Sequence, residues 1–395
     1  MFKYIIIGAG FAGATMAERI AEDLGEKVLV VERRNHIGGN AYDRYDSSGV
    51  LIHQYGPHIF HTKIKRVWDY LSRFTEWNLY HHRVLGAIDG QEVPVPINLN
   101  SLRSLLPENI YESLSDKLVE RFGYHSKIPI LRLRDSGDDE LNRLADLVYE
   151  KVFLHYTTKQ WGVKPEELNP QVTGRVPVSI TRDDRYFQDP YQGLPRNGYT
   201  QLFMKMLSHP NIKLLLNTDY KEIVEINDET TEIRVFGQPF SGQVIYTGKI
   251  DELLDYKLGE LPYRSLRFEF ETYAQEKYQT VGTVNYPNDY DFTRITEFKH
   301  LTGQKHAYTT IVKEYPQPYE REVIGKDVPY YPFPNEENHS LYAKYRGLAK
   351  KLKQITLIGR LAEYTYYDMD AVVAKALKVY DEKFAKGHEV LETED

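Results

Sequence analysis

The sequence predicts an α/β protein with a discontinuous dinucleotide-binding domain, an inserted α-helical bundle and an antiparallel β-sheet domain. Three observations support this fold class. The chain begins with an apolar strand, residues 4–7, that runs into the glycine motif G-x-G-x-x-G. A second apolar strand at 28–31 ends in an acid, and a late strand at 355–358 ends in Gly-Arg before a final helix. We therefore expect the two ends of the chain to bind one long dinucleotide together.

The glycine motif consists of Gly8, Gly10 and Gly13 and is followed by a helix to residue 24. In a Rossmann-like fold the first glycine permits the tight turn, the second lets the backbone approach a pyrophosphate, and the third lets the helix pack on the strand. Glu32 follows about twenty residues later, where a carboxylate accepts hydrogen bonds from an adenosine ribose. The alternative, a glycine-lined helix start without a nucleotide, leaves the register of strand, helix and acid unexplained.

The residues from Glu32 onward indicate which dinucleotide is bound. A carboxylate at Glu32 would repel the extra phosphate of NADP, so NAD and FAD remain. Arg34, Gly38 and Gly39 extend the phosphate-facing surface and resemble the long FAD-binding signature of glutathione-reductase-like flavoproteins. The C-terminal strand that ends at Arg360 leads into a helix whose N-terminus can stabilise negative charge on a reduced flavin. We expect FAD rather than NAD.

Composition and charge exclude several functional classes. The 395 residues contain no cysteine, which excludes disulfides, thiolate nucleophiles and cysteine-ligated metals. The formal net charge of −7 gives no reason to expect a nucleic-acid partner. No apolar run approaches the roughly 18 residues that span a membrane, and the first strand begins without a leader, so we expect a cytoplasmic protein. The 32 tyrosines suit sugars, bases and phosphates, although ordinary packing accounts for most of them.

The remaining elements follow from periodicity and turn signals. Between residues 53 and 62 a Gly-Pro pair forces a turn, and two histidines flank an apolar pair after it. We expect a loop against a bound ring there and no metal, because no carboxylate completes a helical ligand set. The other expected elements are a helix from Lys65 to Trp77, a hairpin from Arg83 to Val95, helices from Leu99 to about Lys159, a helix at Phe203–Leu207, strand-like residues from Ile212 to Ile226, a strand at 241–248, an antiparallel sheet from Leu266 to Val312, and a helix from Ala371 to Lys386 capped by Asp368 and Asp370.

These elements predict three units. The dinucleotide-binding domain comprises residues 1–78, 196–250 and 335–395, the helical bundle comprises 98–160, and the antiparallel sheet with the substrate face comprises 79–97, 161–195 and 251–334. Residues 163–177 contain three prolines and a glycine and are expected to form a mobile loop. The substrate cleft should lie where the three units meet.

Seven motifs occur along the chain in the order in which a known family has them. They are Gly8-Ala-Gly-Phe-Ala-Gly13, His36-Ile-Gly-Gly-Asn40, Tyr55-Gly-Pro-His-Ile-Phe-His-Thr62, Tyr156-Thr-Thr-Lys-Gln-Trp-Gly162, Arg294-Ile-Thr-Glu297, Pro329-Tyr-Tyr-Pro332, and Gly359-Arg360 with Tyr366-Tyr-Asp-Met-Asp370. This set resembles bacterial UDP-galactopyranose mutase. The motifs with Gly-Pro-His-Ile-Phe-His and Asp-Met-Asp are far more specific than the glycine motif, and the resemblance covers nearly the whole chain.

The resemblance implies an isomerase that interconverts UDP-galactopyranose and UDP-galactofuranose without net redox change and supplies galactofuranose for cell-surface polysaccharides. Contracting the ring requires the bond from C1 to the ring oxygen to break, while C1 is locked as a glycosyl phosphate. The family uses N5 of reduced FAD as the nucleophile, through a covalent adduct with C1. A homodimer is also implied.

The resemblance assigns residues to these tasks. Arg175, in the expected mobile loop, and Arg294 would clamp the substrate pyrophosphate, and with His61 they form the catalytic set. The substrate-binding set is Phe153, Tyr156, Thr157, Trp161, Arg175, Tyr186, Phe187, Arg264, Asn285, Arg294, Tyr331, Tyr366 and His82. The cofactor-binding set is Gly8, Gly10, Phe11, Gly13, Glu32, Arg33, Gly39, Asn40, His58, Ile59, Arg360, Tyr366, Asp368 and Met369. His82 departs from the family pattern, which often has asparagine there, and leaves that polar contact open.

Two alternatives stand beside this interpretation. An FAD-dependent oxidase of the amine or carotenoid type would share the glycine motif but would need an apolar cleft, which Arg175 and Arg294 oppose. A flavin- or UDP-sugar-binding protein without turnover would bind the nucleotide sugar and form no product.

Overall fold

A five-stranded parallel sheet organises the computed structural model, which describes residues 2–162, 177–323, 325–333 and 335–385. The strand order is β12 (Ile212–Leu215), β2 (Val28–Val31), β1 (Tyr4–Ile7), β16 (Gln243–Tyr246) and β22 (Ile355–Leu357). Each neighbouring pair is parallel, and Tyr4 lies opposite both Val28 and Gln243. The sheet combines strands from residue 4 to residue 357, which confirms the discontinuous α/β architecture.

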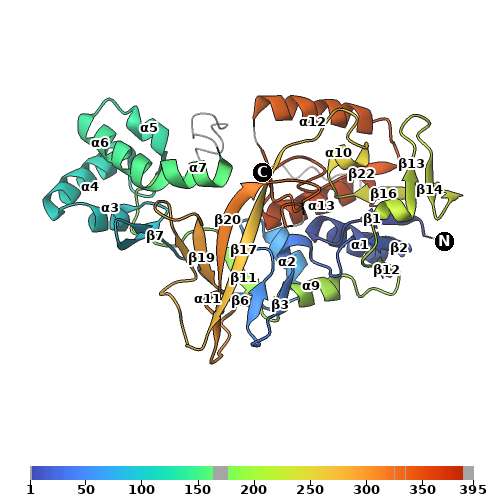
Figure 1. The fold of residues 1–395 in the computed structure, drawn as a ribbon, viewed down its shortest axis with the longest axis horizontal. Coiled ribbons are helices and arrows are strands. Elements are labelled where there is room, and N and C mark those ends of the chain that lie inside the picture. The colour runs from blue at the N-terminus through green and yellow to red at the C-terminus, as the bar shows by residue number, and fades with distance from the viewer. Residues whose placement is uncertain (1, 163–176, 324, 334, 386–395) are drawn as a thin grey trace.

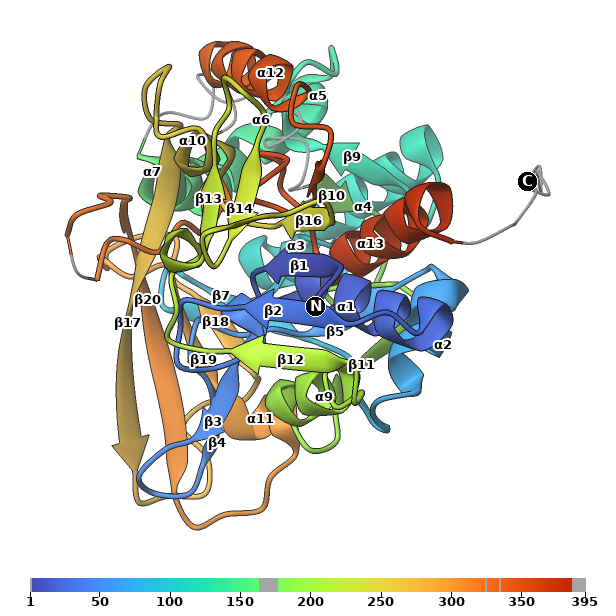
Figure 2. The ribbon, with the colours of Figure 1, turned by 90° about the vertical axis from the view of Figure 1, so that its right-hand side faces the viewer.

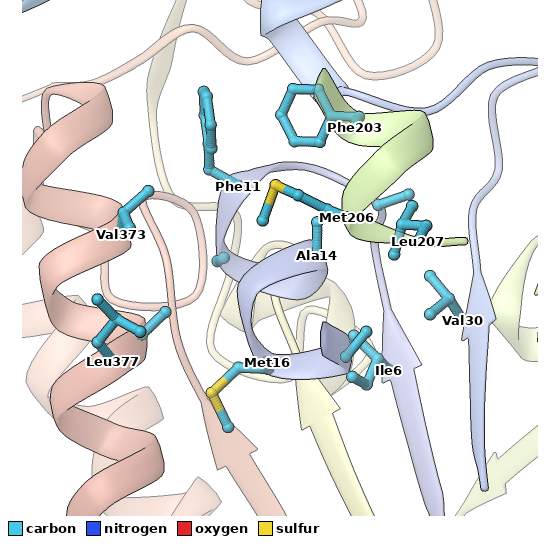
Figure 3. Packing of buried hydrophobic residues seen from close by; sticks show 14 of the residues in the cluster. Ile6, Phe11, Ala14, Met16, Val30, Phe203, Met206, Leu207, Val373 and Leu377 are labelled. Carbon is cyan, nitrogen blue, oxygen red and sulfur yellow. The ribbon is translucent and has the colours of Figure 1, made fainter. Parts of the chain in front are cut away.

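Helices cover both faces of this sheet, because successive residues of each strand point to opposite sides. On one side Ile6 and Val30 pack with Met16, Phe203 and Leu377 (Figure 3). On the other side lie Ile5, Val31 and their neighbours. The helices are α1 (Phe11–Leu24), α9 (Tyr199–Met206) and α13 (Met369–Lys383) on the first side, and α10 (Ile250–Leu253) and α12 (Glu336–Ala349) on the second. Figure 2 shows α13 beside α1, so the last described helix packs on the first.

A seven-stranded sheet forms the second layer and lies between the parallel sheet and the helical bundle (Figure 1). Its order is β21 (Tyr331–Pro332), β17 (Tyr263–Tyr273), β20 (Thr309–Pro318), β19 (Arg294–Glu297), β18 (Thr283–Asn285), β7 (Val84–Ile88) and β8 (Gln91–Val95). The pairs are antiparallel except β18 with β7. The expected hairpin around Asp89 and Gly90 is present as β7 and β8.

The helical unit has its own apolar core, built from the inward faces of short helices. It comprises α3 (Leu99–Leu105), α4 (Glu108–Phe122), α5 (Ile130–Arg134), α6 (Asp139–Val148), the π-helix η2 (Tyr149–Leu154) and α7 (His155–Trp161). A two-stranded ribbon, β9 (Lys127–Pro129) with β10 (Pro177–Ser179), interrupts the expected helical run. Asn98 begins α3 with a capping box, in which its side chain accepts from Ser101 N and the Ser101 hydroxyl accepts from Asn98 N.

The structure corrects three predicted boundaries. The helix expected to reach Trp77 is α2 (Lys65–Ser72), because the chain turns back there and Trp77 stacks on Trp68 at 4.4 Å between ring centroids. The strand-like stretch 212–226 is divided by a 3₁₀ turn at Tyr220–Glu222 that Asp219 caps. The last helix begins at Met369, two residues early, and Asp368 occupies its N-cap position without a side-chain capping bond.

The remaining strands and turns connect these layers. They are η1 (Gly39–Ala41), β3 (Asp43–Tyr45), β4 (Leu51–His53), β5 (Phe60–Thr62), β6 (Trp77–Leu79), β11 (Tyr191–Pro195), β13 (Val224–Ile226), β14 (Ile233–Val235), β15 (Gln238–Pro239) and α11 (Phe298–Thr302). β5, β11 and β6 form a small sheet that carries the histidine-rich motif. Within the described ranges, no helix combines the length and apolar character needed to cross a membrane.

Candidate active site

The glycine motif forms one wall of a cavity of about 240 Å³ at the carboxyl end of the parallel sheet. Gly8 has φ +102°, and a Cβ there would lie 2.1 Å from Thr247 Oγ1. A Cβ on Gly13 would lie 1.9 Å from the Gly8 carbonyl oxygen, so only glycine lets α1 sit this close to the turn. The backbone of Gly39 faces that of Gly10, since a Cβ on Gly39 would come within 3.1 Å of Gly10 Cα. These glycines leave a cradle of bare backbone of the kind that binds a pyrophosphate.

Glu32 both lines this cavity and holds its wall in place. Its Oε2 accepts from Ala9 N at 2.9 Å, and its Oε1 accepts from Arg34 N at 2.9 Å. Arg34 in turn donates to Asn40 Oδ1 at 3.0 and 3.1 Å, and its guanidinium lies 4.3 Å from the centre of the Tyr55 ring. The Glu32 carboxylate therefore holds the loop through the chain's own backbone, and its contact with a ribose stays a prediction.

The opposite wall of the cavity comes from the C-terminal segment. Arg360 donates to the carbonyl oxygens of Tyr330 and Tyr367 at 3.1 and 2.6 Å, which fixes its guanidinium beside Met369 and the start of α13. The N-terminus of α13 carries a partial positive charge. The two ends of the chain thus face each other across one cavity, as the sequence predicts.

His58 lies at the junction between this cavity and a larger one. Its Nδ1 lies 2.8 Å from the Gly56 carbonyl, which can only accept, so Nδ1 carries the proton. Burial, together with neighbouring His53, lowers the pKa of His58 to about 3 and keeps the ring neutral. Its Nε2 is therefore an acceptor, and the ring that lines both cavities is neutral.

The second cavity, of about 590 Å³, lies between the seven-stranded sheet, the helical unit and the histidine motif. This volume is in the range of small-molecule sites. Of the predicted substrate and catalytic residues, it is lined by Phe153, Tyr156, Thr157, Tyr186, Phe187, Asn285, Arg294, Tyr331, Tyr366, His61 and His82. Of the predicted cofactor residues, Asn40, His58, Ile59, Arg360, Tyr366, Asp368 and Met369 also line it. The structure brings these residues together from widely separated parts of the chain.

Arg294 is the principal charge of the second cavity. Its Nε lies 3.0 Å from Oε2 of Glu314, its cross-strand neighbour, whose side chain is 2 % exposed. The Nε···Oε2 alignment is too poor for a hydrogen bond, and among the described residues Arg294 Nε, Glu314 Oε1 and Asn285 Oδ1 are buried without any hydrogen-bond partner. Burial opposes the charge of Arg294, but Glu314 raises its pKa well above the usual value. A permanent cation with unsatisfied polar neighbours marks a site built for a polar ligand.

Tyrosine hydroxyls surround this cation. Burial raises the pKa of Tyr156, Tyr186 and Tyr331, so each keeps its proton and can donate to an oxygen. Tyr331 and Tyr366 stack with their centroids 5.6 Å apart, and Tyr186 is 38 % exposed although it lines the cavity. This combination of a guanidinium and several phenols suits a diphosphate.

Two histidines complete the cavity next to Phe187. His61 stacks on that ring at 3.6 Å between centroids, and its Nδ1 lies 2.6 Å from Asp189 Oδ2. The Nδ1 of His82 lies 3.1 Å from the Tyr80 hydroxyl. Burial, then Arg294 and His61, lower the pKa of His82 to about 3, so it is a neutral hydrogen-bonding group.

Some predicted residues lie elsewhere. Arg264 lies outside both cavities, where its Nε and Nη2 donate to the carbonyls of Gln160 and Lys159 at 3.1 and 3.4 Å. Trp161 is also outside the lining, 6.2 Å from the ring of Tyr331, and Gly13 is buried beneath the cradle. Arg175 and the rest of the proposed mobile loop up to residue 176 fall outside the described residues.

Sequence reasoning missed Glu314 and Asp189, which hold the key cation and histidine. Glu314 lies beyond Val312, where the predicted sheet ended, and its only signal is an acid opposite Arg294 in the strand register. Asp189 follows Phe187 by two residues and carries no motif. Glu314 and Asp189 can be recognised as partners of Arg294 and His61 only once the pairing of distant strands is known.

The fold and cavities define a dinucleotide-binding protein with a ring-lined, cationic ligand site beside its cofactor. Comparison with known proteins identifies the family. The family model of UDP-galactopyranose mutase matches residues 151–366, and that of the NAD(P)-binding Rossmann-like domain matches residues 6–74. The chain belongs to the UDP-galactopyranose mutase family, an FAD-dependent family of isomerases.

Individual relatives agree with this assignment. UDP-galactopyranose mutase of Mycoplasma pneumoniae is 36 % identical, over 95 % of this chain and 94 % of the relative. A dTDP-fucopyranose mutase of Escherichia coli is 35 % identical, over 96 % of this chain and 97 % of the relative. The crystal structure of a reduced UDP-galactopyranose mutase superposes with a TM-score of 0.72 over 98 % of this chain and 97 % of that chain at 17 % identity, which shows the fold.

Proposed function

We propose that this chain interconverts UDP-galactopyranose and UDP-galactofuranose without a net change of redox state. The observation that carries this proposal is that the two cavities adjoin, because Asn40, His58, Arg360 and Met369 line both. A dinucleotide held by the glycine cradle therefore has its far end next to the cavity of Arg294. The names of the UDP-galactopyranose mutases among its relatives support the substrate pair.

The cradle fits FAD in its chemistry. The bare backbone around Gly10 and Gly39 suits the pyrophosphate, Glu32 and Arg33 lie at the AMP end, and Arg360 and Met369 lie where the ring system would meet α13. Reduced FAD, when bound, supplies a nucleophilic ring nitrogen for an anomeric carbon.

The residues of the second cavity bind the UDP leaving group and stabilise its charge. Departure of UDP leaves negative charge on the diphosphate, and Arg294 stabilises it with a cation that Glu314 holds in place. Tyr156, Tyr186 and Tyr331 keep their protons and donate to the phosphate oxygens. We propose that Arg175 adds a second cation from the expected mobile loop.

His61 and Phe187 form a rigid pair at the sugar end. Asp189 fixes the imidazole through Nδ1, and Phe187 stacks on one face of its ring. The pair excludes water from that end and holds the sugar ring over the cofactor end of the cavity. The domain boundaries predicted from the expected elements and the cytoplasmic location expected from the first strand remain predictions. The homodimer and the supply of galactofuranose to polysaccharides are predictions from the family resemblance.

The test is conversion of UDP-galactofuranose by the purified yellow protein under anaerobic conditions, with and without dithionite. We expect rapid formation of UDP-galactopyranose only in the reduced sample. Absence of product in both samples, with flavin bound, would refute the proposal and favour the oxidase or the non-catalytic binder.

A second candidate substrate comes from the relative that is a dTDP-fucopyranose mutase at nearly the same identity. The same assay with dTDP-fucopyranose and dTDP-fucofuranose decides between them. We expect a higher kcat/KM for the UDP-galactose pair, and the reverse order would assign the chain to the dTDP-fucose reaction.

A further inference from the structure

The ammonium group of Lys159 is bound by three backbone carbonyls of one loop. Lys159 lies on α7, and its Nζ donates to the carbonyl oxygens of Tyr286, Tyr290 and Phe292, the last two at 2.9 and 3.3 Å. An ammonium has three N–H donors, so this arrangement uses each one. The half-buried ammonium therefore holds the loop through its main chain.

This loop joins β18 to β19, and its two ends carry ligand-site residues. Asn285 ends β18 and Arg294 begins β19, and the two are cross-strand partners. Tyr286 N donates to the Thr293 carbonyl at 2.8 Å and closes the loop above them. Asn285 Oδ1 and Arg294 Nε are the buried, unpartnered atoms described above. The loop therefore connects directly to both of these residues.

Helix α7 carries the other side of the same cavity. Tyr156 and Thr157 line the cavity within one helical turn of Lys159. The helix is itself held from β17, because Arg264 donates to the carbonyls of Lys159 and Gln160. A second bond joins the loop to the helical unit, from Asn288 Nδ2 to the Lys151 carbonyl at 3.0 Å.

We propose that Lys159 is a positioning residue for substrate binding, which fastens the β18–β19 loop to α7 and so sets the spacing between Arg294 and Tyr156. The inference rests on the proposed function, because it assigns the nucleotide diphosphate to this cavity. Lys159 lines neither cavity, and it acts through the residues at the two ends of its contacts.

Two opposing effects act on the pKa of the Lys159 ammonium. Burial lowers the pKa of Lys159 to about 8, and Asp289 and Asp291 of the same loop act in the opposite direction. The guanidinium of Arg264 binds the same end of α7, through the carbonyls of Gln160 and Lys159, and His155 lies one turn before Lys159 on the helix. As pH rises through about 8, the ammonium loses a proton and with it one of its three donors, so the fastening should weaken on the alkaline side.

The test compares Lys159→Met with Lys159→Arg in the FAD-loaded protein. Lys205→Met, on the exposed side of α9, is the matched control for loss of a lysine charge. Binding of UDP to the oxidised protein is measured by calorimetry, and KM and kcat for UDP-galactofuranose are measured with dithionite. Because methionine removes the charge and with it all three bonds to the loop, we expect the UDP Kd and the KM to rise about tenfold with kcat within about twofold. Lys159→Arg should recover most of the affinity, and Lys205→Met should change nothing.

Two further measurements make the result decisive. Asn288→Ala removes the second bond of the loop and should raise the UDP Kd about threefold, which tests the idea even if Lys159→Met folds poorly. Between pH 7 and 8.5 the wild-type affinity for UDP should fall more than that of Lys159→Arg, which keeps its charge.

The outcomes separate this inference from the proposed function. Wild-type protein that does not bind UDP overturns the proposed function and this inference with it. If the wild-type protein binds UDP and a folded Lys159→Met variant binds it with equal affinity, the positioning role is overturned and the proposed function is not. A Lys159→Met that loses kcat at unchanged KM, or an Arg variant with the same pH dependence as wild type, also overturns it.

Discussion

Replacing Arg294 by methionine should destabilise the protein more at neutral pH than at acid pH. The substitution leaves the Glu314 carboxylate buried without its cation. Burial already raises the pKa of Glu314, and Arg294 acts against that rise, so its removal raises the pKa further. Above pH 4.5, the usual pKa of a glutamate, the Glu314 carboxyl of the folded variant therefore keeps a proton that the same carboxyl releases in the unfolded chain. Where the folded state binds more protons than the unfolded state, the free energy of unfolding falls as pH rises.

The size of the effect follows from the geometry. Unit charges 3.0 Å apart, the Arg294 Nε to Glu314 Oε2 distance, attract by about 5.5 kcal/mol at an effective dielectric constant of about 20. Removing one partner of a buried pair costs about 3–5 kcal/mol in measured cases. The Arg294 side chain is 26 % exposed to the cavity and its Nε is poorly aligned, so we expect a loss of about 3 kcal/mol at pH 7.5. Near pH 4.5 the loss should be small, because Glu314 is then protonated in the folded variant.

Urea unfolding of the FAD-loaded protein at pH 5 and pH 7.5 measures this difference. The double variant Arg294→Met with Glu314→Gln should recover at least about 2 kcal/mol at pH 7.5, since no buried charge remains unpaired. Arg267→Met, which breaks the exposed pair with Glu269 on β17, is the control and should leave the midpoint unchanged. Equal destabilisation at both pH values, or strictly additive effects in the double variant, would refute the reasoning.

Three other substitutions test the cradle and the sugar end. Gly13→Ala places a Cβ against the Gly8 carbonyl and should weaken FAD binding by more than about tenfold, measured as flavin absorbance per chain after dilution. The control Gly347→Ala, in α12 with open space around it, should keep its flavin. Asp189→Asn removes the charge that holds His61 and should lower kcat about 10- to 100-fold at unchanged UDP affinity, and a normal kcat in the assay would remove His61 from the catalytic set. His82→Asn should leave the pH profile of kcat/KM between 5 and 8 unchanged, because the pKa of His82 near 3 keeps that residue neutral throughout; an acidic limb that vanishes in the variant would contradict this.

Local sequence signals were sufficient for the cofactor half of the fold. The strand, glycine motif and helix over residues 4–24 occur where spacing predicts them, because short-range sterics decide a tight turn and the helix after it. The boundaries that failed depend on distant partners. α2 ends at Ser72 because Trp77 must stack on Trp68 and pair through β6 with β11, and no local pattern encodes that contact.

The candidate site divides in the same way. Arg294 and the tyrosines were predicted from motifs, whereas Glu314 and Asp189 were not, since an acid becomes a partner only when its strand or loop is placed. Arg264, which the resemblance assigns to the substrate set, lies outside both cavities. Its guanidinium suits a diphosphate, yet in the structure it binds the last carbonyls of α7.

The strand order of the parallel sheet also constrains how the chain is made. β1 pairs with β16, and Tyr4 and its partner Gln243 are 239 residues apart in the chain. At synthesis rates of about 5–20 residues per second, β1 waits roughly 10–50 s on the ribosome before that neighbour exists. β16 in turn must wait for β22. Throughout this interval four-residue apolar strands lack one side of their sheet, so the nascent chain is the form of this protein most in need of a chaperone and most prone to aggregate when overproduced.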